Sequence, residues 1–546
     1  MSIPALTVIG LDAATFDVID PLVEAGELPT LARLLDGGAR GSLRSTTHPL
    51  TPLAWTTMTT GVNAGRHGIW DFTERDETGY GLRIVNGSHS RAPAVWSRLS
   101  AAGRRVGIVN VPFTWPAPDV DGFVLAGMDA AAREDGMTSP RDLIGELQSR
   151  FGRLLLDHTF PLDRRGRLDV ELVRESCAQK AAIVDWLVSR YSPELLFVVF
   201  MAADHVHHLA WPDWEERGPE SRVAEVYRIL DSTVGKLLGR LGDDANVLVV
   251  SDHGGGALRG VVNLNAWLAE QGYLEYASAP GYANGNAARL PARRLYELWR
   301  RLPRELRYSL KQRLPGLRER AYGLGAPSVI DWQRTQAFAY GSFGSVVLNV
   351  AGREQFGVVP PGEPYERLRE ELRERLLDLR WTDGQRIVAA VHRREDLFVG
   401  PELDRIPDLI VELRDYAWLG KGNLVRRTPT LEDTISIRAH PDQLYVGSHR
   451  PDGVFVLSGP AARAGAELHG GVADVAPTIL YLLGEPIPAE LEGRLLAEAL
   501  EPSLLDSRPP EFVDQEIAGA ALAGAPTALA SPPEVEERLR DLGYVE

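Results

Sequence analysis

Short apolar runs alternate with longer amphipathic segments along the first half of this 546-residue chain. The apolar runs are Leu6–Leu11, Val106–Val111, Phe123–Leu125, Leu195–Met201 and Asn246–Val250. Because they show little polar alternation, they are typical of strands that are covered on both faces of a parallel sheet. The amphipathic segments are Phe16–Leu35, Ala92–Ala102, Glu171–Ser189 and Val223–Leu241. This alternation predicts a doubly wound α/β fold, a mainly parallel sheet flanked by helices, in which ligands sit beyond the carboxyl ends of the strands.

The rest of the chain divides into three parts. Residues 281–330 are strongly basic, and their helically spaced leucines are interrupted by Pro303 and Pro315. We expect a helical insertion or cap there, either a solvated basic face or a surface that attracts an anionic substrate or a membrane. Residues 331–500 are expected to complete the core begun by residues 1–280, and the main sheet resumes with Ala337–Tyr340, Val346–Val350, Ile387–Val391, Leu409–Leu413 and Gly453–Leu457. Residues 501–546 are expected to form an acidic flexible tail that ends in a short helix.

Composition excludes several classes of protein. The formal net charge of −16 argues against a chain that coats nucleic acid, which needs a dense basic surface. Cys177 is the only cysteine, so a disulfide framework is excluded. No apolar run approaches the roughly 18 residues that span a bilayer, and the N-terminus is typical of a strand rather than a signal peptide. We therefore expect a cytoplasmic, soluble protein without membrane association.

Four separated segments place acids, histidines or both at expected strand ends. They supply Asp12, the pair Asp204 and His208, the pair Asp252 and His253, and His449. A charged side chain directly after a buried apolar run is costly unless it is paired or coordinated. Mixed carboxylate and imidazole ligands favour zinc or manganese over calcium or magnesium. The set therefore predicts a metal site.

Thr51 lies directly before Pro52, which opens an expected short helix. The simpler interpretation is an N-cap residue with proline at the first helical position. The alternative is a nucleophile, because a helix N-terminus stabilises an alkoxide and an incoming phosphoryl group. His48 stands three residues earlier, and we interpret it as a loop histidine, with an approach to the site as the alternative.

These residues carry a family resemblance. The chain resembles the alkaline phosphatase superfamily in the ordered set Asp12, Thr51, Asp204-x-x-x-His208, Asp252-His253 and His449. It is most similar to the type I phosphodiesterase/nucleotide pyrophosphatase branch, whose Thr-Gly…His-Gly-Ile segment is matched at residues 60–69. Thr51 stands ten residues before Gly61, the spacing expected for the nucleophile, and residues 474–480 fit the closing helix. The resemblance spans roughly residues 6–277 and 331–493.

The resemblance implies a phosphoester hydrolase with two divalent metal ions, zinc or alternatively manganese. One ion would be held by Asp204, His208 and His449. The other would be held by Asp12, Asp252, His253 and the Thr51 oxygen. Thr51 would attack phosphorus and form a covalent phospho-threonine, which water then hydrolyses.

Departures from the family pattern concern the substrate. Phe72 stands where nucleotide pyrophosphatases carry an asparagine that contacts the phosphate, so a preference for dinucleotides stays open. Asn110 is the candidate substrate-binding replacement, with a turn-stabilising asparagine as the other interpretation. The segment after Thr51 lacks the Cys/Ser-x-Pro-x-Arg pattern of sulfatases. We expect a phosphodiesterase or pyrophosphatase that acts on a small-molecule phosphoester; the alternatives are a phosphomonoesterase or phosphomutase, a membrane-associated phosphotransferase, and a non-catalytic binding module.

Overall fold

The computed structural model describes residues 4–75, 79–130, 136–156, 161–163, 167–240, 245–277, 329–341, 343–424, 427–433 and 446–514. The basic insertion expected at residues 281–330 lies outside this part of the chain except for its last two residues. The expected tail lies outside it beyond residue 514. None of the described helices is long and apolar enough to cross a membrane.

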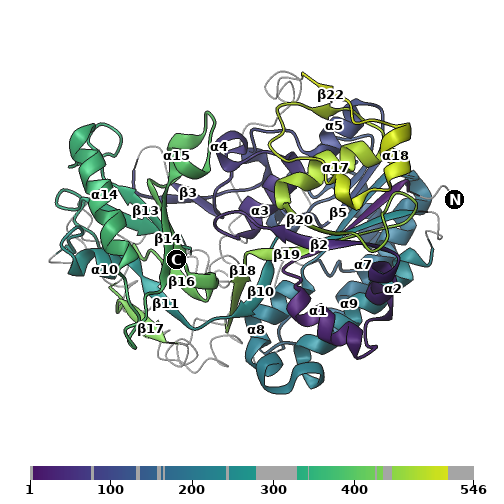
Figure 1. Cartoon of the computed structure of the whole chain (residues 1–546), viewed down its shortest axis with the longest axis horizontal. Coiled ribbons are helices and arrows are strands. Elements are labelled where there is room, and N and C mark those ends of the chain that lie inside the picture. Colours follow the sequence, from purple (N-terminus) through teal and green to yellow (C-terminus); the bar gives the residue numbers. More distant parts are fainter. Residues whose placement is uncertain are drawn as a thin grey trace.

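A nine-stranded sheet forms the centre of the larger lobe (Figure 1). Its strands, in order across the sheet, are β20 (Glu467–Gly471), β2 (Gly38–Arg44), β19 (Asp452–Ser458), β9 (Asn246–Val250), β1 (Leu6–Leu11), β8 (Leu195–Phe200), β5 (Val106–Val109), β6 (Gly122–Leu125) and β7 (Thr138–Ser139). The five strands from β9 to β6 are parallel, whereas β19 and β7 pair antiparallel with their neighbours. This sheet confirms the predicted doubly wound α/β class.

Both faces of the sheet are buried, as the uninterrupted apolar runs predict. In β8, Leu195, Phe197 and Val199 belong to one apolar cluster, and the alternate residues belong to the cluster on the opposite face. The first cluster is covered by α3 (Thr51–Thr60), α5 (Val95–Ala101) and α17 (Val475–Leu482). The second is covered by α1 (Phe16–Glu24), α2 (Pro29–Asp36), α6 (Leu143–Phe151), α7 (Val170–Tyr191), α8 (Ala202–Arg217) and α9 (Arg222–Leu238).

A second, smaller lobe contains four of the apolar runs that were expected to continue the main sheet. It holds an antiparallel sheet of β12 (Ala337–Tyr340), β13 (Ser345–Leu348), β15 (Leu409–Leu413) and β14 (Val388–Arg393). Around it lie α10 (Leu264–Glu270), α14 (Glu363–Leu377), α15 (Arg394–Leu397) and the three strands β16 (Trp418–Lys421), β11 (Gly260–Asn263) and β17 (Leu431–Asp433). All of these elements except α15 contribute to a third apolar cluster, and we call the whole set the small-sheet lobe (Figure 1).

The expectation that the main sheet resumes was therefore wrong for four of its five runs. Only the last, which became β19, joins the nine-stranded sheet. Apolar periodicity reports that a strand is buried, but it does not report which sheet the strand joins. β12 and β13 are joined by a short turn, which favours antiparallel pairing with each other over a crossover into the main sheet.

Shorter elements lie between the two lobes and at their edges. The ribbon of β10 (Gly254–Ala257) and β18 (Gly447–Arg450) lies between them (Figure 1). The hairpin of β3 (Thr73–Arg75) and β4 (Leu82–Ile84) follows α4 (Ala64–His67). The short 3-10 helix η6 (Arg414–Tyr416) precedes β16 in the small-sheet lobe. Near the end of the described chain lie α18 (Pro502–Ser507) and the pair β21 (Ile487–Pro488) and β22 (Phe512–Val513).

Candidate active site

The carboxyl ends of β1, β8 and β9 bring the predicted ligands together. Asp12 follows β1 directly, and its amide donates to the carbonyl of Phe200 at the end of β8. Asp204 and His208 lie in the first turns of α8, and Asp252 with His253 follows β9. His449 reaches the same place from β18, which pairs with the strand that follows His253. These residues are all buried, with at most 6% of the surface of each residue exposed.

The ligating atoms form two overlapping groups. Asp12, Asp252 and His253 make one group, and Asp204, His253 and His449 make the other, with all atoms of a group within 4.8 Å of one another. Nε2 of His208 joins the second group, 3.1 Å from Asp204 Oδ1 and 2.9 Å from His449 Nε2. His253 belongs to both groups. Its ring stacks on that of His449, with the two ring centroids 3.8 Å apart.

Thr51 stands beside this cluster as the first residue of α3. Its Oγ1 lies 3.4 Å from Nε2 of His253. Leu50 occupies the N-cap and supplies no side-chain hydrogen bond, so Thr51 is not the N-cap residue of the simpler interpretation. The N-terminus of α3, the positive end of the helix dipole, therefore lies beside the Thr51 hydroxyl.

Burial sets the charge states of the cluster. Burial, together with the charge of Asp204, raises the pKa of Asp252 well above its usual value. Burial also works against the ionised form of Asp204, but His208 and His449 hold the pKa of that carboxyl well below its usual range. Burial lowers the pKa of His253 and of His449, so both imidazoles are neutral, the form that binds metal.

The cluster fits divalent cations. Among the described residues, none donates a hydrogen bond to Oδ2 of Asp252, although this oxygen is fully buried. An orphaned carboxylate oxygen of this kind is costly unless a cation or proton satisfies it. Carboxylate oxygens with neutral imidazole nitrogens are a donor set that suits zinc or manganese.

Backbone carbonyls fix the orientation of the three histidines. Nδ1 of His449 donates to the carbonyl of Pro49 at 2.6 Å, and Nδ1 of His208 donates to the carbonyl of Gly447 at 3.2 Å. His253 donates in the same way to the carbonyl of its neighbour Gly254 at 3.0 Å. Because Nδ1 carries the proton in each ring, the lone pair of Nε2 is left for the cluster.

One side chain of the site was missed in the sequence. Nε1 of Trp55 donates to Oδ2 of Asp12 at 2.7 Å. Trp55 stands four residues after Thr51 in α3, so one helical turn places both on the face toward Asp12. The four-residue spacing from Thr51 was the available sequence signal for Trp55. It could be used only by a reader who already knew that Thr51 lies close to Asp12.

Asn110 lies at the end of β5, with a left-handed backbone at φ 59°. It is fully buried, and Nδ2 donates to the carbonyl of Val199 in the neighbouring β8 at 3.1 Å. This bond ties the ends of two central strands together. A contact of Asn110 with the substrate stays a prediction.

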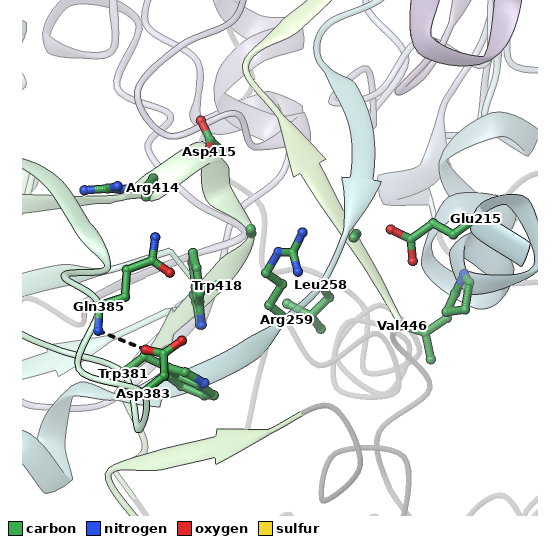
Figure 2. Close-up of a pocket in the computed structure, with 13 residues that line it drawn as sticks. Glu215, Leu258, Arg259, Trp381, Asp383, Gln385, Arg414, Asp415, Trp418 and Val446 are labelled. Atoms are coloured by element: carbon green, nitrogen blue, oxygen red, sulfur yellow. Dashed lines mark hydrogen bonds between the residues drawn. The ribbon is translucent and has the colours of Figure 1, made fainter. Parts of the chain in front are cut away.

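A cleft of about 610 Å³ is lined by residues of α8 on one side and of the small-sheet lobe on the other (Figure 2). Glu215 borders it from α8 and Val446 from the start of the β18 segment. Trp381 and Trp418 of the small-sheet lobe form its other side, and Arg259 projects between the two sides. The small-sheet lobe therefore lies against the same elements that carry Asp204, His208 and His449.

A comparison with known protein families finds one family that this chain matches. The sequence profile of the type I phosphodiesterase / nucleotide pyrophosphatase family matches residues 6–430. No curated protein sequence matches the chain.

Solved structures with a similar chain path have low sequence identity to this chain. Phosphonoacetate hydrolase from Sinorhizobium meliloti 1021, solved with phosphonoformate, is 16% identical, and the match covers 88% of this chain and 95% of that one at a TM-score of 0.52. Its complex with phosphonoacetate has the same identity and coverage at a TM-score of 0.53. Murine ectonucleotide pyrophosphatase / phosphodiesterase 5 is 13% identical, with 91% and 100% coverage and a TM-score of 0.47. The likeness to phosphonoacetate hydrolase shows a similar fold and nothing beyond it.

Proposed function

The chain belongs to the type I phosphodiesterase/nucleotide pyrophosphatase family of the alkaline phosphatase superfamily, whose members are phosphoester hydrolases, and from this premise we propose a phosphodiesterase or pyrophosphatase with Thr51 as nucleophile. The observation that carries the proposal is the position of Thr51 Oγ1, 3.4 Å from His253 Nε2. The hydroxyl thus stands at the buried ligand cluster and at the N-terminus of α3.

Two divalent ions complete the proposed site. Asp12, Asp252, His253 and the Thr51 oxygen would hold one, and Asp204, His208 and His449 the other. When bound, such ions neutralise the carboxylates and stabilise negative charge on the phosphoryl oxygens. We propose zinc, with manganese as the alternative, because the donors are mixed carboxylates and imidazoles.

The chain's own groups position the reaction. Thr51 Oγ1 attacks phosphorus, the new oxygen–phosphorus bond forms, and the bond to the leaving-group oxygen breaks. The N-terminal amides and dipole of α3 favour the negative charge that develops beside Thr51. The proton of the Thr51 hydroxyl is lost in this step, and the leaving-group oxygen gains one. Water then attacks the phospho-threonine, the bond between phosphorus and Oγ1 breaks, a phosphate monoester is released, and a proton of the water restores the Thr51 hydroxyl.

The charge around the cluster favours a diester over a monoester. Within the described part of the chain, the ion pairs recorded for Asp204 and Asp252 involve histidines and no lysine or arginine. A doubly charged phosphomonoester gains more from extra fixed cations than a singly charged diester does. A phosphomonoesterase or phosphomutase is therefore the second choice on the same scaffold.

The test is an assay of zinc- or manganese-loaded protein on matched aryl phosphate diester and monoester substrates. We expect diester turnover, and we expect Thr51→Ala to lower kcat by at least about a hundredfold. Thr60→Ala is the matched control, because this threonine lies in the same helix and its hydroxyl donates to the carbonyl of Thr56. Full turnover by Thr51→Ala contradicts the covalent mechanism, and monoester preference favours the second choice.

A further inference from the structure

His48 lies in an aromatic enclosure next to the nucleophile. It is 2% exposed, and neither ring nitrogen has a hydrogen-bond partner among the described residues. Its ring centroid is 5.7 Å from that of Trp70, 5.9 Å from that of Phe343 and 5.9 Å from that of Tyr416. Trp70 and Tyr416 meet the imidazole edge to face, an arrangement that aromatic pairs prefer. We call these three side chains the aromatic clasp.

Two members of the clasp come from the small-sheet lobe. Phe343 lies in the turn between β12 and β13, and Tyr416 is the last residue of η6. Trp70 follows α4 in the larger lobe, so the clasp is closed from both lobes. His48 is the residue on which they meet.

His48 belongs to the loop that presents Thr51. Its carbonyl accepts hydrogen bonds from the Leu50 amide at 2.9 Å and from the Thr46 hydroxyl at 2.7 Å. Leu50 is the N-cap of α3, and its carbonyl accepts from the Ala54 amide. The backbone of Leu50 therefore links the His48 carbonyl to the first turn of α3, where Thr51 lies.

The same loop and the clasp are both tied to a metal ligand. The carbonyl of Pro49 accepts the hydrogen bond from Nδ1 of His449, and the ring of Phe343 lies 5.4 Å from the ring of His449. The guanidinium of Arg450 donates to the carbonyl of Tyr416 at 3.3 Å and to that of His449 at 2.8 Å. Nucleophile loop, clasp and His449 thus form one connected unit.

The backbone at Tyr416 is strained. Asp415 and Tyr416 have φ values of 53° and 49°, and neither is a glycine. Consecutive left-handed residues with side chains persist only where the surroundings hold them, and such strain gathers at functional sites. Here the conformation places the Tyr416 ring against His48, where its hydroxyl is also hydrogen-bonded to the Thr47 side chain.

The neutral state of His48 agrees with a packing role. Burial, with a smaller effect from His392, lowers the pKa of the imidazole to about 3. The ring is therefore uncharged near neutral pH, and it contributes shape rather than a charge.

We propose that the small-sheet lobe positions the catalytic nucleophile: Phe343 and Tyr416 hold the loop of residues 46–50 through His48 and act as positioning residues for Thr51. The proposal rests on the proposed function for the role of Thr51, and on the contacts above for the clasp. On this proposal the small-sheet lobe lines the cleft and also holds Thr51 in position.

The test compares Phe343→Leu and Tyr416→Leu with Tyr416→Phe, which keeps the ring, in metal-loaded full-length protein. Hydrogen exchange should accelerate by about tenfold or more at the Leu50 and Ala54 amides in the two leucine variants, and by clearly less in Tyr416→Phe, which keeps the ring against His48 and loses only the hydroxyl contact with Thr47. We expect kcat to fall ten- to about a hundredfold with KM within about threefold, because misplacement of the nucleophile affects the chemical step. Bound metal should stay at the wild-type ratio.

Tyr80→Leu is the matched control. Tyr80 stacks on Trp332 at 3.7 Å and joins the β3–β4 hairpin to the small-sheet lobe, without a recorded contact to residues 46–50 in the described structure. It should lower thermal stability while exchange at Leu50 and kcat stay near wild type. If Tyr80→Leu lowers kcat as Tyr416→Leu does, general loosening explains the effect and the proposal fails.

Three further outcomes decide between the two proposals. Unchanged exchange at Leu50 in both leucine variants overturns the clasp, whatever the activity. A raised KM with unchanged kcat, or loss of metal, overturns it too, because the residues then act on substrate or on His449. Faster exchange in a protein whose Thr51→Ala variant keeps full turnover supports the clasp and contradicts the proposed function.

Discussion

At the scale of single residues, main-chain carbonyls orient the imidazoles of the site. The carbonyls of Pro49, Gly447 and Gly254 accept the Nδ1 protons of His449, His208 and His253. A carbonyl in a strand or a loop next to a helix moves less than a side chain does, so the three Nε2 atoms are held before any cation arrives.

Trp55 donates a side-chain hydrogen bond to the Asp12 carboxylate, and the removal of this donor tests the site at the scale of a single residue. Trp55→Phe keeps an aromatic ring in the core, although a smaller one, and removes the indole N–H that donates to Asp12 Oδ2. We expect zinc affinity to weaken by ten- to about a hundredfold, as is usual when a partner of a metal ligand is lost. Isothermal titration of chelator-treated protein measures this change.

Trp96→Phe is the control for that substitution. Trp96 and Trp55 both meet the ring of Phe197 edge to face, at 6.2 and 6.1 Å, in the same apolar cluster. Trp96 has no recorded contact with Asp12 in the described structure, so its variant should bind zinc as the wild type does. Equal affinities for both variants would show that Trp55 matters only for packing.

The ligands were predictable from the sequence, but their supports were not. Asp12 and Asp252 each follow a β-branched run, and parallel strands bring such positions to one edge. Trp55 and Pro49 carry no comparable signal. A carbonyl acceptor is present at every residue, and the partner of Trp55 lies 43 positions away in the chain.

At the scale of elements, the β10–β18 ribbon is built to lie directly against α8. A Cβ at Gly447 would stand 2.2 Å from the carbonyl oxygen of His207, and one at Gly255 would stand 1.9 Å from Nδ1 of the same residue. The absence of side chains at these two positions is what allows β18 to bring His449 beside Asp204 and His208 of α8.

Gly447→Ala should therefore separate the two elements. The methyl group would meet backbone rather than a movable side chain, so β18 must shift away from α8. We expect a loss of about 1–3 kcal/mol in the free energy of unfolding and weaker metal binding at the second ligand group. Urea unfolding and zinc titration measure the two effects.

Gly145→Ala in α6 serves as the comparison for Gly447→Ala. A Cβ at Gly145 meets nothing within 4 Å, and the residue is helical. The substitution should stabilise the protein by about 0.5–1 kcal/mol, with metal binding unchanged. If Gly447→Ala also leaves stability and metal binding undiminished, then close contact between the β10–β18 ribbon and α8 is not needed to place His449.

Element types were predictable from periodicity, whereas breaks and sheet membership were not. The segment Phe16–Leu35 reads as one amphipathic helix, but the structure divides it into α1 and α2 at Gly26, whose φ is 74°, and Pro29 begins the second helix. The four runs of the small-sheet lobe are apolar in the same manner as β1 and β8. Long-range pairing decides their sheet, and it leaves no local pattern.

At the scale of the whole molecule, folding assembles a cluster that is electrostatically unfavourable by itself. Asp12, Asp204 and Asp252 come from three distant parts of the chain and are buried together. The raised pKa of Asp252 records part of this cost, since burial and the charge of Asp204 both oppose its ionisation. A cation that binds only the folded chain offsets the cost, so metal binding and folding are coupled.

Removal of the metal is therefore expected to lower the stability of the whole chain. A ligand at a hundred times its dissociation constant stabilises the folded state by about 2.7 kcal/mol, so chelation should lower Tm by several degrees. Because protons compete with the metal for the Asp252 carboxylate, whose pKa burial and the charge of Asp204 raise, the difference in Tm between loaded and chelated protein should grow as the pH is raised from 6 to 8. Thermal unfolding with zinc and with EDTA at both pH values measures it.

Two asparagine variants locate this effect in the cluster. Asp252→Asn removes a carboxylate whose ionised form is opposed in the metal-free fold, so the chelated variant should be at least as stable as chelated wild type. It should also gain less from zinc, and the gain should depend less on pH. Asp129→Asn changes another buried carboxyl, whose pKa burial raises to about 6, but it lies outside the cluster and binds the amides of Trp115 and Gly87. Its zinc-induced gain should equal that of wild type, and an equal loss of that gain in both variants would place the metal-linked stability elsewhere than at Asp252.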